Sequence, residues 1–518
     1  MTRPRIYLTT PIYYVNDKPH IGHAYTSLAT DVLARWKRLA GHEVFFLTGT
    51  DEHGQKVEKA ARDAGMEPQA FTDQVSESFR TLARAMNFSN DDFIRTTEQR
   101  HHESCQALWQ RLVARDEIYL GNYEGWYAVR DEAFYGPDEL VERDGVKYAP
   151  SGAPVEWVRE PSYFFRLEKW RAELLRRYDL PTGHPEAIEV FPETRRNEVR
   201  SFVKSGLQDL SISRTSFTWG VPVPGDPAHV MYVWLDALTN YITAVGYPDE
   251  TATLWPFWTD HEVTHFVGKD IVRFHTIYWP AFLMAAGLPL PKRIFAHGWW
   301  TVEGQKMSKS LGNAIDPIAL VEEYGLDPLR YFLLREVPFG QDGDFSRKAL
   351  VARLNGELAD ALGNLANRTL SLIQRNCEGR LPEAAARAPG DAALFGSVDM
   401  LAEMVGRALD QQAFHTALET VFAAVREANG YITVQAPWSL KKTDPARMAD
   451  VLRHLHTALR CYATILQPFM PDTMAKMLDQ LGVPEAARDL AALNTPLPVG
   501  IALPPPSPLF RKIEDAVG

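Results

Sequence analysis

Cysteine is scarce in this sequence, and the cysteines present cannot form the usual covalent or metal scaffolds. The three of them, Cys105, Cys377 and Cys461, are widely separated and odd in number. A disulfide framework and a four-cysteine zinc site are therefore excluded. A reducing cytoplasm is the expected compartment.

Long apolar runs and an excess of basic charge are also missing. No apolar stretch approaches the roughly 20 residues that a membrane-spanning helix needs, and residues 1–5 lack the apolar segment of a secretory signal. The net charge of −11 argues against a protein that coats nucleic acid irrespective of sequence. Local basic faces remain compatible with it, and the C-terminal third carries a basic excess that also fits solvated helix faces.

The 518 residues, 45% of them hydrophobic, allow two to four domains with sizeable cores. An apolar run at 5–10 predicts a strand, and helically spaced apolar residues between Ala29 and Trp36 predict a helix that stops near Gly41. A second apolar run at 44–47 precedes another helix. This strand–helix alternation favours a parallel, doubly wound sheet, whose ligands gather at the carboxyl ends of the strands.

The alternation breaks between about 116 and 230, which is rich in aromatics, glycine and proline, and it resumes with a strand at 264–267, a helix at 271–286 and a strand at 293–296. Beyond about 346, leucines recur at helical spacing and predict a bundle. We therefore expect five segments: the first half of an α/β domain, an insertion, its second half, a helical domain and a tail, at 1–115, 116–230, 231–345, 346–500 and 501–518.

Two motifs carry chemistry. The tetrapeptide HIGH at 20–23 places His20 and His23 at a helix start, where backbone N–H groups and the helix dipole favour phosphate, and Gly22 would let a nucleotide ring approach the backbone. The pentapeptide KMSKS at 306–310 places Lys306 and Lys309 in a loop suited to pyrophosphate. Each motif alone is weak, whereas both in one α/β domain indicate nucleotide chemistry.

This pair resembles the signatures of the class I aminoacyl-tRNA synthetases. The similarity to the methionine enzymes of that class extends over almost the whole chain. It includes TPIYYVND at 10–17, GTDEHG at 49–54, YVWLDA at 232–237 and VGKD at 267–270. The resemblance implies a Rossmann-like catalytic domain split by a connective insertion and followed by an α-helical anticodon-binding bundle.

The resemblance also implies roles for single residues. His20, Gly22, His23, Lys306 and Lys309 would bind ATP, supplied with Mg²⁺, and the histidines and lysines would stabilise the transition state of activation. Asp51 would hold the methionine ammonium, because a charged amine in a closed pocket needs a carboxylate partner. Eight positions would line the pocket for the thioether side chain: Ile12, Tyr14, Trp234, Ala237, Leu238, Tyr241, Ile271 and His275. Arg214 would lie near the reacting groups or form a structural salt bridge.

In the helical domain, the resemblance assigns anticodon reading to Asn364, Arg368 and Trp438. A stacking ring beside amide and guanidinium donors suits splayed single-stranded bases. From the residues alone, Asn364 is better interpreted as a capping or core residue and Trp438 as a packing anchor. The expected partners are L-methionine, ATP and both the initiator and the elongator tRNA(Met).

The sequence departs from many members of this family in its insertion. Residues 127–132 and 148–152 resemble regions that carry zinc-binding cysteines in those relatives but contain no cysteine here. We therefore expect no structural zinc, and packing must hold the insertion. The chain lacks the additional C-terminal domain that dimerises some relatives, so we expect a monomer.

The pentapeptide HEVTH at 261–265 matches the zinc-protease motif HExxH, which requires a helix to bring the two imidazoles together. Here the residues that follow predict a strand, which would separate the two histidines by roughly 13 Å. Two competing functions stay open. One is that of a class I synthetase for another apolar amino acid or for cysteine, disfavoured by the missing zinc-binding cysteines and by the missing editing insertion. The other is that of a non-catalytic tRNA-binding paralogue, disfavoured by the intact His20, His23, Asp51, Lys306 and Lys309.

Overall fold

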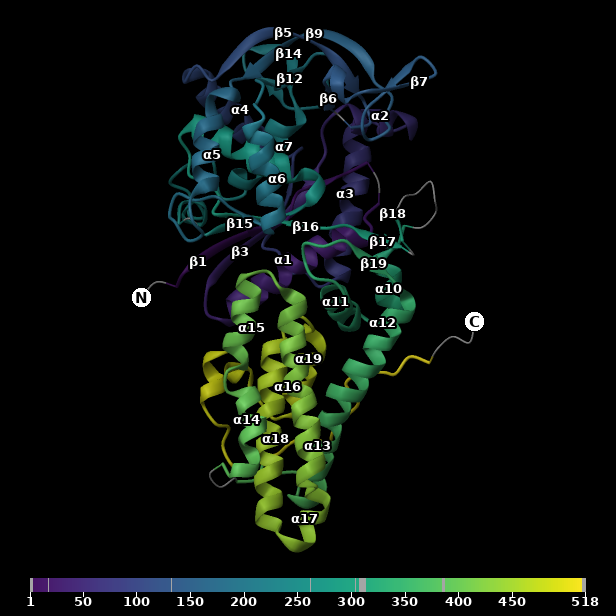
Figure 1. Ribbon diagram of the computed structural model, residues 1–518, viewed down its shortest axis with the longest axis vertical. Helices are drawn as coiled ribbons and strands as arrows, with labels where there is room; N and C mark the ends of the chain where they lie inside the picture. The colour runs from purple at the N-terminus through teal and green to yellow at the C-terminus, as the bar shows by residue number, and fades with distance from the viewer. Residues whose placement is uncertain are drawn as a thin grey trace.

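The computed structural model describes residues 3–16, 18–131, 133–260, 262–302, 304–306, 314–383 and 387–514. An α/β part carries a β-rich extension on one side and an all-helical bundle on the other (Figure 1). None of the described helices is both long and apolar enough to cross a membrane.

The centre of the α/β part is a parallel sheet, as the sequence predicts. In the described chain it has seven strands, in the order β10 (Glu189–Phe191), β16 (Arg293–His297), β15 (Val263–Gly268), β1 (Arg5–Thr9) and β3 (Glu43–Asp51), with β2 (Tyr13–Tyr14) and β4 (Asp92–Arg95) both pairing with β3. Every pairing in this sheet is parallel. Parallel sheets are covered on both faces, which explains their continuous apolar runs.

The helices of the first half follow the strands in the expected alternation. They are α1 (Ile21–Leu39), α2 (Gln55–Asp63), α3 (Pro68–Ala85) and α4 (Gln99–Ala114). Strand β1 lies between β3 and β15. The sheet is therefore extended on one side of β1 by β3 of the first half and on the other side by β15 of the second half. Ligands of such folds bind outside the carboxyl ends of the strands at this switch point.

The segment expected as an insertion forms its own antiparallel layers. Its longest strands, β5 (Ile118–Ala128) and β9 (Glu156–Phe165), pair along their lengths. The others are β6 (Ala133–Tyr135), β7 (Val141–Arg143), β8 (Val146–Tyr148), β11 (Leu210–Ser211), β12 (Ser213–Arg214), β13 (Pro222–Val223) and β14 (Asp226–Met231), with helices α5 (Arg171–Asp179) and α6 (Glu193–Lys204). The segment also contributes β10 to the main sheet. This strand was not predicted, because three residues are too few to form a recognisable pattern.

The helix expected at 271–286 is divided into three kinds of turn. A 3-10 turn at Lys269–Ile271 leads to a π-helical segment at Phe274–Tyr278, and only then to α9 (Trp279–Ala286). The physical reason is Pro280, which has no N–H to donate to the carbonyl of Thr276. The hydroxyl of Tyr178 donates to that carbonyl instead.

The second half also contains α7 (Val233–Thr243) and α8 (Pro256–Thr259). After β16, the strands β17 (Trp300–Val302), β18 (Gln305–Lys306) and β19 (Gly343–Phe345) form a small sheet. Two helices, α10 (Pro317–Tyr324) and α11 (Leu326–Arg335), lie between β18 and β19 in the sequence. Helix α11 packs against both α1 and the bundle.

The remaining chain is the predicted helical bundle. A continuous helical stretch comprises α12 (Arg347–Arg353), a π-helical segment (Leu354–Gly363) and α13 (Asn364–Asn376), followed by α14 (Ala392–Val398), α15 (Leu401–Asp410), α16 (Phe414–Gln435), α17 (Pro437–Thr443), α18 (Pro445–Leu466) and α19 (Pro471–Gln480). The periodic leucines Leu354, Leu358, Leu362 and Leu365 are all buried. The tail packs back onto this stretch, with the N–H of Ile513 donating to Asn355 Oδ1 over 2.9 Å.

A fully buried ion pair lies where the α/β part meets the bundle. Arg330 Nη2 of α11 lies 2.7 Å from Asp31 Oδ2 of α1, and both side chains are 0% exposed. The same guanidinium donates to the carbonyls of Met86, Pro468 and Phe469. Burial alone would raise the pKa of Asp31, but Arg330 and Arg35 outweigh it and hold that pKa below the ordinary value.

Replacing Arg330 by methionine should lower the free energy of unfolding by about 3–5 kcal/mol, because the buried carboxylate of Asp31 loses one of its two arginine partners and keeps only Arg35. Since the pKa of Asp31 is depressed, the pair stabilises the protein above the ordinary carboxyl pKa and loses this effect as pH falls through the folded value. Urea denaturation at neutral pH measures the loss. Arg407→Met is the matched control, because the side chain of Arg407 is 74% exposed and that of its partner Glu403 is 48% exposed. Its free energy of unfolding should differ from that of the wild type by no more than about 0.5 kcal/mol. Equal losses would contradict the prediction.

Candidate active site

His20 and His23 form the N-terminal cap of α1. The backbone N–H of Gly22 donates to His20 Nδ1, and the backbone N–H of His20 donates to His23 Nδ1, each over 3.0 Å. The two imidazoles are thereby held with their ring centroids 4.0 Å apart. The sequence predicts this pair at the start of a helix after the first strand, and the structure confirms that placement.

These caps also determine which ring nitrogens carry protons. A nitrogen that accepts from a backbone N–H has no hydrogen, so in the neutral forms of both histidines the proton is on Nε2. Burial lowers the pKa of His20 and lowers that of His23 well below the ordinary value, where the nearby His20 contributes further. At neutral pH the turn therefore presents two uncharged N–H donors in addition to the helix N-terminus.

Gly22 provides the space for one of these rings. A Cβ atom at this position would lie 2.9 Å from Cε1 and 3.1 Å from Nδ1 of His20. Real Cβ atoms essentially never approach another atom as closely as the first of these distances. A side chain here would therefore displace the imidazole of His20.

Asp51 is buried at the carboxyl end of β3, where it pairs with Tyr14 of β2. The next residue, Glu52, is fixed by Arg95, whose Nε and Nη2 donate to its two carboxylate oxygens over 2.7 and 2.9 Å. The hydroxyls of Thr50 and Thr97 also donate to that carboxylate. Asp51 is thus held on a rigid strand end.

Five of the eight residues predicted to line an apolar pocket belong to one hydrophobic cluster or pack against it. Leu238 and Tyr241 of α7 are buried in the cluster that packs around β1 and β15, and Ile12, Trp234 and Ile271 pack against it while remaining partly exposed. The ring of Trp234 stacks on Phe274 with centroids 3.4 Å apart. Ala237 is also buried.

Tyr241 and His275 form the polar end of this apolar cluster. His275 Nδ1 lies 3.0 Å from the carbonyl of Ile271, so it carries the proton, and its Nε2 accepts from the hydroxyl of Tyr241 over 2.7 Å. Burial lowers the pKa of His275 to about 4, which keeps the ring neutral. The Tyr241 hydroxyl directs its proton to His275, so its oxygen acts as an acceptor toward other groups.

Arg214 is 2% exposed on β12 of the insertion. Its guanidinium lies 4.0 Å from the ring centroid of Tyr232, which caps α7, and donates to the hydroxyl of Ser211. Its Nε lies 3.7 Å from Glu160 Oε1. The salt bridge considered from the sequence is therefore present, and it lies next to the helix that carries Trp234.

The second sequence motif lies largely outside the described residues. The backbone of Lys306 belongs to β18 and pairs with Thr301 of β17, whereas Lys309 falls within 307–313. Residues 20–23, with His20 and His23, are called the histidine turn below. The chain that follows residue 313 contacts this turn, where the N–H of Ile21 donates to the carbonyl of Ile315 over 3.2 Å. The residues that follow the motif therefore contact the helix start that carries His20 and His23.

Residues 127–132 and 148–152 of the insertion, which resemble the zinc-binding regions of relatives, are held by packing and hydrogen bonds. Ala128, Ala149, Ala153 and Val155 form a small buried cluster. The carboxylate of Asp131 accepts from the hydroxyls of Tyr135 and Ser151 and so joins the two regions. In the protease-like motif, Val263–Gly268 forms strand β15, which confirms the predicted strand; His261 lies outside the described residues.

In the bundle, the structure brings two of the three predicted anticodon residues together. The guanidinium of Arg368 on α13 lies 5.5 Å from the ring centroid of Trp438 on α17, and Trp438 is 45% exposed. Asn364 is exposed at the start of α13, one turn before Arg368. Helix α17 lies at the end of the bundle that points away from the sheet (Figure 1).

A buried polar cluster behind the apolar wall was not expected from the sequence. His53, His101 and Asp236 are joined there by hydrogen bonds from the two imidazoles to the carboxylate. Two of these residues stand in motifs that the resemblance had marked, GTDEHG and YVWLDA. A polar residue in each of these motifs was the available signal.

The comparisons with known proteins agree with this geometry. The family model described as tRNA synthetases class I (M) matches residues 6–370, and the model of the anticodon binding domain of methionyl tRNA ligase matches residues 381–517. Among curated proteins, the methionine–tRNA ligase of Brucella suis is 54% identical over 518 residues, with 100% of this chain and 99% of that protein covered. That of Rickettsia bellii is 56% identical over 480 residues, 92% of each.

Solved structures extend the likeness to three dimensions. Mycobacterium tuberculosis methionyl-tRNA synthetase in complex with methionyl-adenylate matches with a TM-score of 0.94 at 49% identity, over 98% of this chain and 99% of that one. Its free form matches with a TM-score of 0.89 at 46% identity, over 99% of each chain. The chain therefore belongs to the methionine branch of the class I tRNA synthetases, the ligases that join methionine to tRNA.

Proposed function

We propose that this protein forms methionyl-adenylate from L-methionine and MgATP and then transfers the methionyl group to the 3′-terminal adenosine of tRNA(Met), both initiator and elongator. The observation that carries the proposal is the shared edge of the sheet. There, two neutral imidazoles at a helix N-terminus, a buried carboxylate and an aromatic wall with one polar end lie around the carboxyl ends of β1 and β3.

The histidine turn is proposed to bind the phosphates. Nε2–H groups of His20 and His23, together with the N-terminus of α1, would donate to phosphate oxygens as charge develops on them. Lys306 and Lys309 would hold the leaving pyrophosphate from the other side. Neutral donors suit this task because their protonation does not change between pH 7 and 8.

The methionine would lie between Asp51 and α7. The Asp51 carboxylate would pair with the ammonium, while Ile12, Tyr14, Trp234, Ala237, Leu238 and Ile271 would surround the side chain. A flexible thioether packs well against aromatic rings. The Tyr241 hydroxyl, whose proton is directed to His275, would face the sulfur with its oxygen.

No nucleophile from the protein is required for the chemistry. An oxygen of the methionine carboxylate bonds to the α-phosphorus, and the bond from that phosphorus to the bridging oxygen breaks, so that pyrophosphate leaves with the electron pair. The terminal ribose hydroxyl of tRNA then attacks the acyl carbon and releases AMP. The protein contributes positioning and electrostatic stabilisation, and Arg214 would assist near the adenylate through Tyr232 and α7.

Three further properties are proposed from the sequence. The insertion would need no structural zinc, since the Asp131 hydrogen bonds and the alanine cluster hold together the regions where ligands would be expected. The protein would act as a monomer in the cytoplasm. The domain boundaries proposed above assign anticodon reading to the bundle, through Asn364, Arg368 and Trp438.

ATP–pyrophosphate exchange with each of the twenty amino acids offered separately should proceed with methionine alone. The pocket residues proposed above include no cation for an acidic side chain, and no second site that would correct errors was expected from the sequence. Exchange with another amino acid would overturn the pocket assignment and favour another class I synthetase. Folded protein that supports no exchange, with or without tRNA, would favour a non-catalytic tRNA-binding role.

Gly22→Ala should slow adenylate formation by between about tenfold and a hundredfold, because the new methyl group displaces the His20 ring by a distance that matters for catalysis. Stopped-flow or exchange rates measure this. Alanine is a better helix former than glycine, so the melting temperature should not fall. The control Gly430→Ala in α16, whose Cβ would meet nothing within 4 Å, should leave exchange unchanged. Equal rates for both variants would remove His20 from the mechanism.

Trp438→Ala should raise the KM for tRNA by about tenfold or more, because stacking of one base on an aromatic ring contributes about 1–3 kcal/mol. Exchange without tRNA should stay at the wild-type rate. Aminoacylation at several tRNA concentrations separates the two effects. Met404→Ala, at another exposed apolar residue of the bundle (52% exposed), serves as the control. A loss of exchange in Trp438→Ala would show that the residue is needed for folding.

A further inference from the structure

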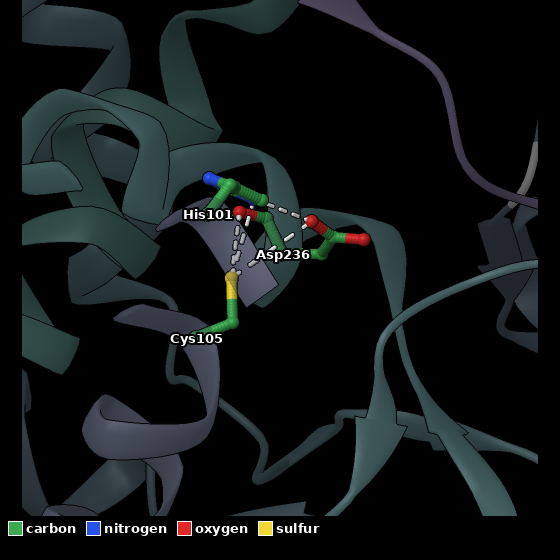
Figure 2. Close-up of side chains that lie close together, drawn as sticks. All are labelled: His101, Cys105 and Asp236. Carbon is green, nitrogen blue, oxygen red and sulfur yellow. Dashed lines mark hydrogen bonds and ion pairs between the residues drawn. The ribbon is translucent and has the colours of Figure 1, made fainter. Parts of the chain in front are cut away.

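Asp236 lies at the centre of a buried cluster behind the proposed methionine pocket. Its Oδ1 lies 2.7 Å from His101 Nε2 and its Oδ2 lies 2.6 Å from His53 Nδ1, so each carboxylate oxygen accepts from a different imidazole. The Sγ of Cys105 lies 3.2 Å from His101 Nε2 (Figure 2). All four side chains are buried.

The three hydrogen-bonded residues come from three parts of the fold, two of which carry residues of the proposed site. His53 is two residues beyond Asp51, where the chain leaves β3. Asp236 stands in the first turn of α7, between Trp234 and Ala237. His101 belongs to α4, which packs along α7.

Asp236 itself is directed away from the pocket. At 3.6 residues per turn, Trp234, Leu238 and Tyr241 lie about 140–200° around α7 from Asp236. The pocket face and the carboxylate are therefore on opposite sides of one helix. A displacement of the carboxylate rotates or shifts the wall on the other side, which gives this residue influence over the pocket without contact to its contents.

We propose that Asp236 is a positioning residue for methionine: its carboxylate holds His53, and with it the Asp51 end of β3, at a fixed distance from the Trp234–Tyr241 face of α7. His101 completes the device by fixing the other oxygen to α4. This inference rests on the methionine site proposed above. It assigns the separation between the ammonium partner and the side-chain wall to one carboxylate.

The distances in this cluster are those of hydrogen bonds between an imidazole N–H and a carboxylate oxygen. A zinc ion bound to His101 and Asp236 would hold the nitrogen and oxygen about 3.3 Å apart, whereas they are 2.7 Å apart. Zinc would also require a thiolate at Cys105. Burial and the negative charge of Asp236 raise the pKa of that thiol well above its ordinary value. The second carboxylate oxygen is already occupied by His53.

A displaced Asp51 would affect bound methionine in the ground state and in the transition state alike. Loss of such uniform binding raises KM with little change in kcat. The binding of ATP at the histidine turn does not use this cluster, so its KM provides an internal reference. A merely structural role would instead lower the melting temperature and leave the ratio of the two KM values unchanged.

The test compares Asp236→Asn with the wild type in ATP–pyrophosphate exchange. The asparagine keeps the size of the side chain but replaces one acceptor oxygen by an NH₂ group that faces an imidazole N–H. We expect the KM for methionine to rise about tenfold or more, with the KM for ATP within about twofold. A wild-type protein that fails to exchange with methionine would refute the proposed function, whereas an unchanged methionine KM in an active variant would refute this inference alone.

Two other sets of variants keep the inference testable if Asp236→Asn does not fold. His101→Gln retains an N–H donor near the position of Nε2 and should resemble the wild type, whereas His101→Leu removes the donor and should raise the methionine KM. Equal methionine KM values for the two would overturn the proposal. Asp391→Asn is the matched control: Asp391 is a buried carboxylate held by Tyr431 and Arg447 in the bundle. It should change stability but not the KM for methionine.

Elemental analysis of the purified protein tests directly for a metal at this cluster. We expect no zinc that depends on Cys105. One zinc ion per chain in the wild type that is lost in Cys105→Ala would show a metal centre in place of the hydrogen-bonded cluster, and would overturn the proposal.

Discussion

The arrangement of the whole molecule depends on the buried pair of Asp31 and Arg330. Helix α1 begins with the histidine turn, and Asp31 lies about 16 Å further along the same rigid rod. Through that carboxylate the rod is tied to α11 and to the carbonyls of Pro468 and Phe469, where α18 passes into α19. One rigid helix therefore links the position of the proposed phosphate site to the position of the bundle.

The bundle extends this rigid frame to the far end of the molecule. The helical stretch from Arg347 to Asn376 is continuous, although its middle is π-helical, and it carries Arg368 toward Trp438. The leucines of this stretch are buried in the same core as Phe332 of α11 and Leu33 of α1. A single apolar core thus spans both parts, and the distance between the sheet edge and α17 is maintained by packing rather than by a flexible linker.

Features with a local signal could be predicted from the sequence, whereas long-range polar contacts could not. Runs of apolar residues predict β1 and β3, and the helical spacing of the leucines from Leu354 to Leu365 predicts the bundle. Both patterns are visible in the sequence because burial of an element requires apolar residues at fixed intervals. The contact of Asp236 with His53 joins residues 183 apart, and that with His101 joins residues 135 apart. No spacing rule records such pairs. The π-helical turn was not predicted for a related reason. Pro280 shows where a helix is disturbed, but it does not show that the distant Tyr178 supplies the missing hydrogen bond.

The three histidines of the proposed site show how backbone groups assign different chemistry to one residue type. N–H donors from Gly22 and His20 make Nδ1 an acceptor in the histidine turn, so the protons of His20 and His23 lie on Nε2. The carbonyl of Ile271 reverses this at His275, whose Nε2 becomes an acceptor for Tyr241. Burial keeps all three rings neutral. The site thus obtains donors where phosphate charge would develop and an acceptor where a hydroxyl must be oriented, without placing a charged imidazole beside the thioether.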